Sequence, residues 1–145
     1  MELIECEMRF NMNKKQYLIL GIILVTICVF FIFKELTESK PFGNLSSSDI
    51  TNVTVKLSPP DVEYDLNMEE VKDLVPILRS VVTYKKDNSY SEYAGQMVTF
   101  NITKENGETL KIQVYSPFII INDVGYKADY KTCEALNSFA NQLGR

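Results

Sequence analysis

The chain has 145 residues, 46% of them hydrophobic, and a formal net charge of −4. It contains no histidine, which excludes Ser-His-Asp and Cys-His nucleophile systems, histidine-ligated zinc and a histidine pH switch. Mild acidity with mixed signs also argues against a nucleic-acid surface, so no nucleic-acid partner is predicted.

The first predicted element is a membrane-spanning helix over residues 17–33, YLILGIILVTICVFFIF, a stretch without charge. About 17 residues rising 1.5 Å each come close to the lower limit for crossing a hydrocarbon core of ~30 Å. Lysine and arginine are slightly more numerous before this run than after it, which favours an N-terminus inside the cell. The sequence therefore predicts a cytoplasmic tail over residues 1–16 and a single-pass cell-membrane protein with its domain outside.

Other interpretations of this run stay open. A cleaved secretory signal needs a small-residue cleavage site, and the residues after the run do not offer one. A lipoprotein signal would end at Cys28, but Ile27 stands where a small residue is usual. The start of translation is also open among Met1, Met8 and Met12, because the sequence from Met12 has the form of a bacterial export signal.

The three cysteines are Cys6, Cys28 and Cys133. They fall before, within and after the predicted span, so no intrachain disulfide is predicted. Cys133 occupies an apolar position in a predicted helix and is interpreted as a small core residue, with a free reactive thiol as the alternative.

Residues 34–49 are polar, with a proline, a glycine and three consecutive serines. This composition predicts a flexible linker. The linker leaves residues 50–145 as one extracytoplasmic domain, long enough for a single small core.

That domain is predicted to begin with a strand and a helix. Alternating apolar residues in ITNVTVKLS (50–58) indicate a half-buried strand, and VEYDL (62–66) is a weaker extended piece. Asn67 and Glu70 have the spacing of a capping box, so we expect a helix to start there. An apolar stripe continues this helix to Val82.

A polar loop over residues 83–95 is followed by a predicted hairpin over residues 96–115. A two-residue turn at Asn106-Gly107 would place apolar residues opposite polar ones. A three-residue turn, Glu105-Asn106-Gly107, pairs apolar with apolar and sets a lysine opposite a glutamate. It also puts Gly107 at the left-handed position, so we predict the three-residue turn.

The remaining elements are a buried strand, a short last strand and a second helix. FIIIN (118–122) is continuously apolar, which predicts a strand buried on both faces. YKA (126–128) forms the last strand, and Asp129 caps a helix whose apolar stripe includes Cys133. The order β-α-β-β-β-β-α predicts an α+β domain with an antiparallel sheet and both helices on one face.

Tyrosines in the 83–95 loop are the only predicted binding residues. Tyr84, Tyr90 and Tyr93 crowd a segment rich in charge, and tyrosine is enriched at interfaces because its ring is rigid and its hydroxyl polar. The alternative is that these rings cover part of the sheet or lie on a solvated loop.

The sequence offers no stronger chemistry. Asp61, Glu63 and Asp65 alternate along an extended segment, but no loop suited to calcium surrounds them, so a solvated acidic face is the better interpretation. No catalytic residue, metal site or cofactor is predicted.

Several features together resemble a group of small Gram-positive membrane-anchored proteins whose exported domain is uncharacterised. They are the lysine-led start, the apolar run, the serine-containing linker, the ITNVTV strand and the FIIINDVGYKAD segment. The resemblance implies a single span and an exported α+β domain. It implies no activity and no functional residues.

The leading functional hypothesis is a non-enzymatic, membrane-tethered extracytoplasmic module. It would bind a protein, a peptide or a cell-envelope component. One alternative is a cell-surface enzyme using carboxylate or serine chemistry, which a cleft holding two carboxylates of shifted pKa would favour. Another is an immunity or inhibitor protein that plugs a partner's site.

Overall fold

The structure is a computed structural model that describes residues 13–35 and 38–144, without the side chains of residues 31–35. The chain divides into two compact units, with the boundary in the sequence between Glu35 and Leu36. Each unit is described by itself.

The first unit contains helix α1 (Lys14–Glu35). The prediction that residues 17–33 span a membrane is wrong, because no helix in the described part of the chain is both long and apolar enough to cross one. The uncharged run rises only roughly 25 Å as a helix, less than a hydrocarbon core of ~30 Å. The predicted cytoplasmic tail falls largely on residues 1–12, which lie outside the described residues.

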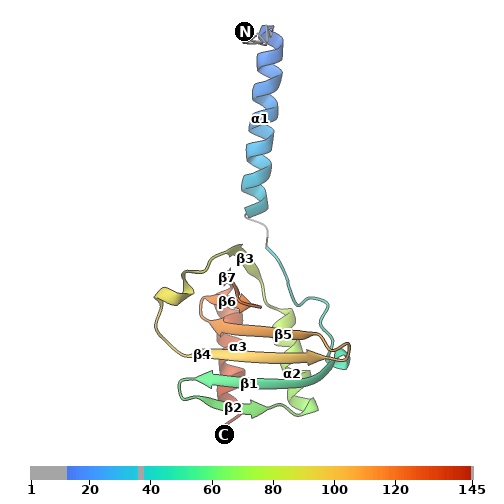
Figure 1. Ribbon diagram of the computed structural model, residues 1–145, viewed down its shortest axis with the longest axis vertical. Helices are drawn as coiled ribbons and strands as arrows, with labels where there is room; N and C mark the ends of the chain where they lie inside the picture. Colours follow the sequence, from blue (N-terminus) through green and yellow to red (C-terminus); the bar gives the residue numbers. More distant parts are fainter. Residues whose placement is uncertain (1–12, 36–37, 145) are drawn as a thin grey trace, which may run out of the picture. The chain divides into compact units, whose positions relative to one another are not determined.

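The second unit is α+β, with seven antiparallel strands in one sheet and two longer helices packed against one of its faces (Figure 1). The strands are β1 (Ile50–Ser58), β2 (Val62–Asp65), β3 (Thr83–Lys86), β4 (Met97–Lys104), β5 (Thr109–Tyr115), β6 (Phe118–Ile121) and β7 (Val124–Ala128). The helices are α2 (Met68–Arg79) and α3 (Tyr130–Gln142), with short 3-10 turns η1 (Ser47–Asp49) and η2 (Ser89–Glu92). The strand order across the sheet is β2-β1-β4-β5-β6-β7-β3.

The predicted element order, β-α-β-β-β-β-α, was wrong because it contained five strands and the structure has seven, although β2 falls within the weaker extended piece VEYDL (62–66). The two additional strands, β2 and β3, form the edges of the sheet. An edge strand is paired on one side only, and both are four residues long. β3 lies inside the segment predicted as a loop, since TYKK has no apolar alternation and only its first residue, Thr83, is buried.

The segment expected to be a flexible linker contributes to the core. Phe42 is 4% exposed and Leu45 is 9% exposed, and both belong to the cluster of buried hydrophobic residues. Ser39 and Thr83 exchange two backbone hydrogen bonds of 2.8 Å, which attach the segment to edge strand β3. The folded unit therefore begins before Ile50, the first residue of β1.

The predicted hairpin register is confirmed by β4 and β5. Ile102 pairs with Leu110, Phe100 with Ile112, and Val98 with Val114. The amide of Gly107 donates to the carbonyl of Lys104 over 2.9 Å, as the three-residue turn requires. Lys104 Nζ also lies 2.9 Å from a carboxylate oxygen of Glu108.

The first prediction concerns Gly107, whose φ is +80°. A Cβ added there would meet no atom within 4 Å, so a substitution tests backbone conformation without steric interference. We expect Gly107→Ala to lower the free energy of unfolding by about 1 kcal/mol, because an L-residue is strained in the left-handed region. Urea unfolding measures this loss, and an unchanged midpoint would show that the turn relaxes into another conformation.

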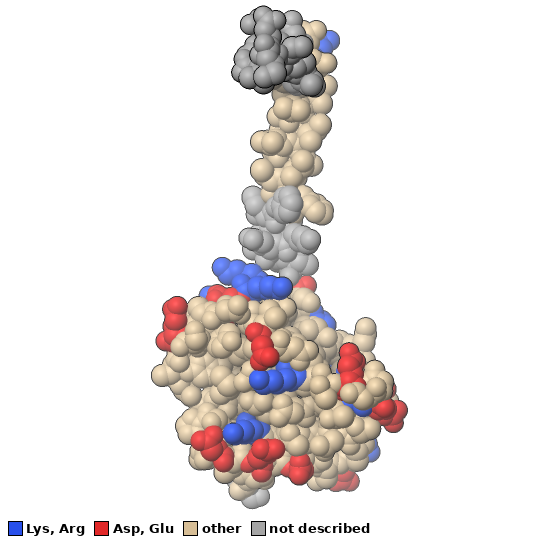
Figure 2. Space-filling view, in the orientation of Figure 1, with Lys and Arg blue, Asp and Glu red and all other residues tan. Residues whose placement is uncertain are grey.

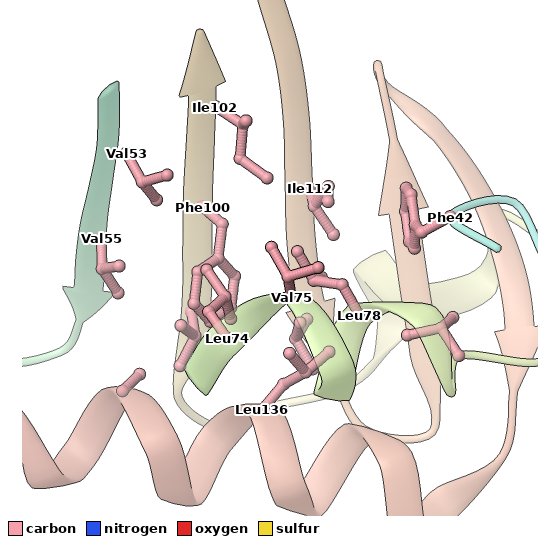
Figure 3. Packing of buried hydrophobic residues seen from close by; sticks show 14 of the residues in the cluster. Phe42, Val53, Val55, Leu74, Val75, Leu78, Phe100, Ile102, Ile112 and Leu136 are labelled. Atoms are coloured by element: carbon pink, nitrogen blue, oxygen red, sulfur yellow. The ribbon is translucent and has the colours of Figure 1, made fainter. Parts of the chain in front are cut away.

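The helices close one face of the sheet over the main core. Asn67 caps α2 as predicted. Its side-chain oxygen accepts from the backbone amide of Glu70 over 3.0 Å, and the backbone amide of Asn67 donates to the Glu70 carboxylate over 2.8 Å. Asp129 caps α3 through the amide of Thr132. Figure 3 shows the packing of helix side chains against the strands, and the residues labelled there are Phe42, Val53, Val55, Leu74, Val75, Leu78, Phe100, Ile102, Ile112 and Leu136.

Strand β6 is buried on both faces, as the FIIIN run predicted. Ile119 pairs with Val114 and joins the main core, so the alternating residues Phe118 and Ile120 point to the opposite face. Phe118 and Ile120 are nevertheless 0% exposed. Since α2 and α3 cover only the first face, another segment must cover β6 on the second.

Candidate functional site

The loop between β3 and β4 covers the second face of the sheet over β6 and β7. It is fixed at Gly125 of β7, where the Gly125 amide donates to Asn88 Oδ1 over 2.8 Å and the Asp87 amide donates to the Gly125 carbonyl over 2.9 Å. The approach is so close that a Cβ on Gly125 would lie 2.5 Å from the Asp87 carbonyl oxygen and 2.9 Å from the Tyr90 ring. Only glycine permits this contact.

Two of the three predicted tyrosines meet on the face that the loop covers. The ring centroids of Tyr93 and Phe118 lie 5.1 Å apart at an interplanar angle of 62°. Tyr90 makes a similar edge-to-face contact with Phe118, with the centroids 6.5 Å apart. Tyr90 is half-buried, while Tyr93 keeps 52% of its surface exposed. Tyr84 lies apart from this loop on strand β3 and is 40% exposed.

The three positions therefore differ in what they offer a partner. Tyr90 has a structural contact with the sheet, and Tyr93 combines a contact with Phe118 with a ring that is 52% exposed. Tyr84 is a surface residue of an edge strand. Their role in binding stays a prediction.

Asp87 organises the start of the loop. Its Oδ1 accepts from the Ser89 hydroxyl over 2.7 Å and from the Ser89 amide over 3.0 Å, and its other oxygen lies 3.8 Å from Lys127 Nζ. The hydrogen bonds from Ser89, and secondarily the charges of Lys127 and Lys85, hold the pKa of Asp87 below its usual value. The ionised carboxylate is thus part of the folded loop.

A pH dependence follows from this lowered pKa. Because the folded chain binds the Asp87 proton less tightly than the unfolded chain, the carboxylate stabilises the fold above the unfolded pKa of roughly 3.9 and loses that effect as pH falls through the lower folded pKa. We expect Asp87→Asn to melt below the unmodified chain at pH 7. The difference should close at the lowest pH at which both chains still fold, and thermal scans measure it. A difference that is constant with pH would mean that the Asp87 charge is unimportant.

Strand β4 begins and strand β5 ends at the same end of the sheet (Figure 1). A groove opens there beside Tyr93. Its first part is an open pocket of about 220 Å³ lined by Tyr93, Ala94, Gly95, Gln96, Tyr115, Ser116 and Asn137. Its second part, of about 360 Å³, is lined by Gln96 and by the α3 residues Glu134, Asn137, Ser138, Asn141 and Gln142. The two parts share Gln96 and Asn137, and we call them together the Tyr93 groove.

Two residues that line the first part of the groove each carry an unsatisfied polar atom. Ser116 Oγ and Asn137 Oδ1 are buried, and neither has a hydrogen-bond partner among the residues that the structure describes. A buried polar group without a partner costs about 1–3 kcal/mol, so most such atoms in folded proteins are paired. Both atoms belong to residues that line this pocket, although neither atom is itself exposed in it.

Two lining side chains, Gln96 and Asn141, are joined by hydrogen bonds. Asn141 Nδ2 donates to Gln96 Oε1 over 2.9 Å, and Gln96 Nε2 donates to the Pro59 carbonyl over 3.0 Å. Asn141 Nδ2 also donates to the Asn137 carbonyl over 2.8 Å. These bonds link α3 to the residue before β4 and to the turn after β1.

The other candidates from the sequence lie elsewhere. Asp61, Glu63 and Asp65 are exposed on the β1–β2 turn and on edge strand β2. Burial, followed by the charges of Asp129 and Glu134, raises the pKa of Cys133 to about 12, so its thiol stays protonated in the core. Within residues 13–35 and 38–144, no group of acidic, cysteine or histidine side chains could hold a metal ion.

Sequence reasoning missed Gln96, Ser116, Asn137 and Asn141, because isolated polar residues next to strands or within a helix form no pattern. One signal was available for the loop. A strand buried on both faces needs a second segment to cover the face without helices. The 83–95 segment carries three tyrosines just before the predicted hairpin, so it was a candidate for that cover.

No family model, no curated protein and no solved structure matches this chain.

Proposed function

We propose that the second unit is a non-enzymatic binding module whose ligand occupies the Tyr93 groove. The observation that carries this proposal is a pocket beside the half-exposed ring of Tyr93, lined by two residues, Ser116 and Asn137, that each carry a buried oxygen without a partner among the described residues. Ligand sites are concave and carry a few polar groups, and the groove is a concave surface lined by several polar side chains.

The lining also supports binding in preference to catalysis. Glu134 is the one carboxylate among the groove residues, so acid–base chemistry with two carboxylates has no second member there. Ser116 and Ser138 have no histidine to activate them in this chain. The expected location of the module outside the cell stays a prediction.

A titration of the full chain with a panel of neutral probes tests the proposal. The panel holds neutral oligosaccharides and short uncharged peptides, and backbone amide chemical shifts report where each probe binds. We expect shifts to cluster at residues 93–96, Ser116 and Asn137, with every probe recovered chemically unchanged. Shifts confined to another surface, the absence of binding by every probe, or conversion of a probe would contradict the proposal.

A further inference from the structure

We infer that the turn between β4 and β5 is a site of self-modification, where Asn106 loses its side-chain amide through a cyclic imide formed with the Gly107 nitrogen. The inference goes beyond the proposed function and does not depend on the Tyr93 groove. It rests on this pair of residues, on the open space around them, and on the hydrogen bonds that the turn gives to the reacting atoms.

The reaction needs no reagent except water. The backbone nitrogen of Gly107 attacks Cγ of Asn106, so a bond forms between these two atoms and the bond from Cγ to Nδ2 breaks. The proton lost by the attacking nitrogen leaves with the departing group, as ammonia. Water then opens the five-membered ring at one of its two carbonyls. The products are an aspartate and an isoaspartate, in which the main chain runs through the side-chain carbon, and no atom is oxidised or reduced.

The sequence and the space around the pair favour this reaction at one position. Asn106 is the only asparagine of the chain that a glycine follows. A side chain on the following residue would hinder the approach of its nitrogen, and glycine has none. Asn106 is exposed, and a Cβ built on Gly107 would meet no atom within 4 Å. The ring therefore has room to form, and water has access to it.

Two hydrogen bonds of the turn act on the reacting groups in opposite ways. The Glu108 amide donates to Asn106 Oδ1 over 3.0 Å, at the oxygen on which negative charge develops during the attack, so this contact promotes the reaction. The Gly107 amide donates to the Lys104 carbonyl over 2.9 Å, and this bond must open before the nitrogen can lose its proton. Such a bond is worth roughly a factor of two to ten in an equilibrium constant, so the folded turn slows the reaction without blocking it.

Both products disturb the turn. Asn106 Nδ2 donates to a carboxylate oxygen of Glu108 over 3.4 Å, and an aspartate replaces this donor with a second carboxylate. Figure 1 places the turn at the right-hand edge of the second unit, and Figure 2 shows acidic side chains together with basic ones on that edge. The new charge thus arrives beside existing negative charge. An isoaspartate lengthens the main chain of a turn whose length sets the register of β4 and β5.

The test follows residues 105–111, which trypsin releases by cutting after Lys104 and Lys111. The full chain is incubated at mildly alkaline pH, either folded or in concentrated guanidinium chloride. Mass spectrometry then measures the replacement of NH2 by OH, with a digest made before the incubation as the blank. We expect conversion in both samples, about fivefold slower in the folded chain. Absence of conversion in the folded chain, or equal rates in the two states, would overturn the inference.

Asn101 is the internal control, because it is exposed in the same hairpin but is followed by Ile102. The β-branched side chain of Ile102 crowds its own backbone nitrogen, so conversion of Asn101 should be slower by roughly an order of magnitude or more. Equal conversion of Asn101 and Asn106 would mean that the turn is not a specific site.

Asn106→Gln is the matched variant, because its amide would have to close a larger ring. After the same incubation of the folded chains, we expect the melting temperature of the unmodified chain to fall by roughly 2 °C and that of the variant to stay unchanged. A fall of equal size in both chains would trace the loss to other positions and overturn the assignment to this turn.

Discussion

Gly125→Ala is expected to lower the free energy of unfolding by about 2–3 kcal/mol, a large effect for one added methyl group. The new Cβ would lie 2.5 Å from the Asp87 carbonyl oxygen and 2.8 Å from Asn88 Oδ1. The first of these atoms belongs to the backbone and cannot rotate away, so the loop has to leave β7. Its departure would break two hydrogen bonds and uncover Phe118.

Urea unfolding measures this loss, with Gly43→Ala as the matched control. A Cβ on Gly43 would find its nearest neighbour at 3.4 Å, so the control should change stability by less than about 0.5 kcal/mol. Equal effects of the two substitutions would mean that the loop does not rest on β7 in solution.

Phe42→Ala is expected to cost about 3–5 kcal/mol, as for a fully buried aromatic residue. The prediction is informative because Phe42 lies in a segment whose composition indicates a linker, although the ring is only 4% exposed within the core. Truncation would leave a cavity between this segment and the sheet.

The control for Phe42 is Asn44→Ala, an exposed position two residues away. It should be nearly neutral in the same unfolding experiment. If both substitutions are neutral, residues 38–49 are a linker after all and the folded unit starts at β1.

Local rules predicted much of the domain. The β4–β5 register followed from pairing apolar with apolar residues and from placing Gly107 at a left-handed position. The Asn67 and Asp129 caps followed from short-range hydrogen bonding. Each of these features depends on residues close together in sequence, so each leaves a pattern that can be read directly.

Features that depend on distant residues were missed. Phe42 and Leu45 are isolated apolar residues among prolines, glycines and serines, and only the folded core shows why they are buried. Strand β3 pairs with β7 through an irregular register. Its sequence, TYKK, has no alternation of apolar and polar residues that would have indicated a strand. The Tyr93 groove joins the ends of β4 and β5 to α3, and no spacing rule connects Gln96 with Asn137.

The transmembrane prediction failed for a different reason. It rested on the absence of charge over residues 17–33, and that run lies at the lower limit of the length a span requires. Absence of charge alone does not make a span.

The most direct test of the account is the affinity of Tyr93→Ala for the neutral probe that the unmodified chain binds most tightly. Tyr84→Ala serves as the matched control. It removes a tyrosine of comparable exposure, 40% against 52% for Tyr93, from strand β3 and away from the groove. Truncation of an aromatic anchor typically costs 2 kcal/mol or more, which is roughly thirtyfold in affinity. The account predicts about that loss for Tyr93→Ala, with cooperative unfolding retained and less than a twofold change for Tyr84→Ala. Equal affinities of Tyr93→Ala and the unmodified chain would contradict it.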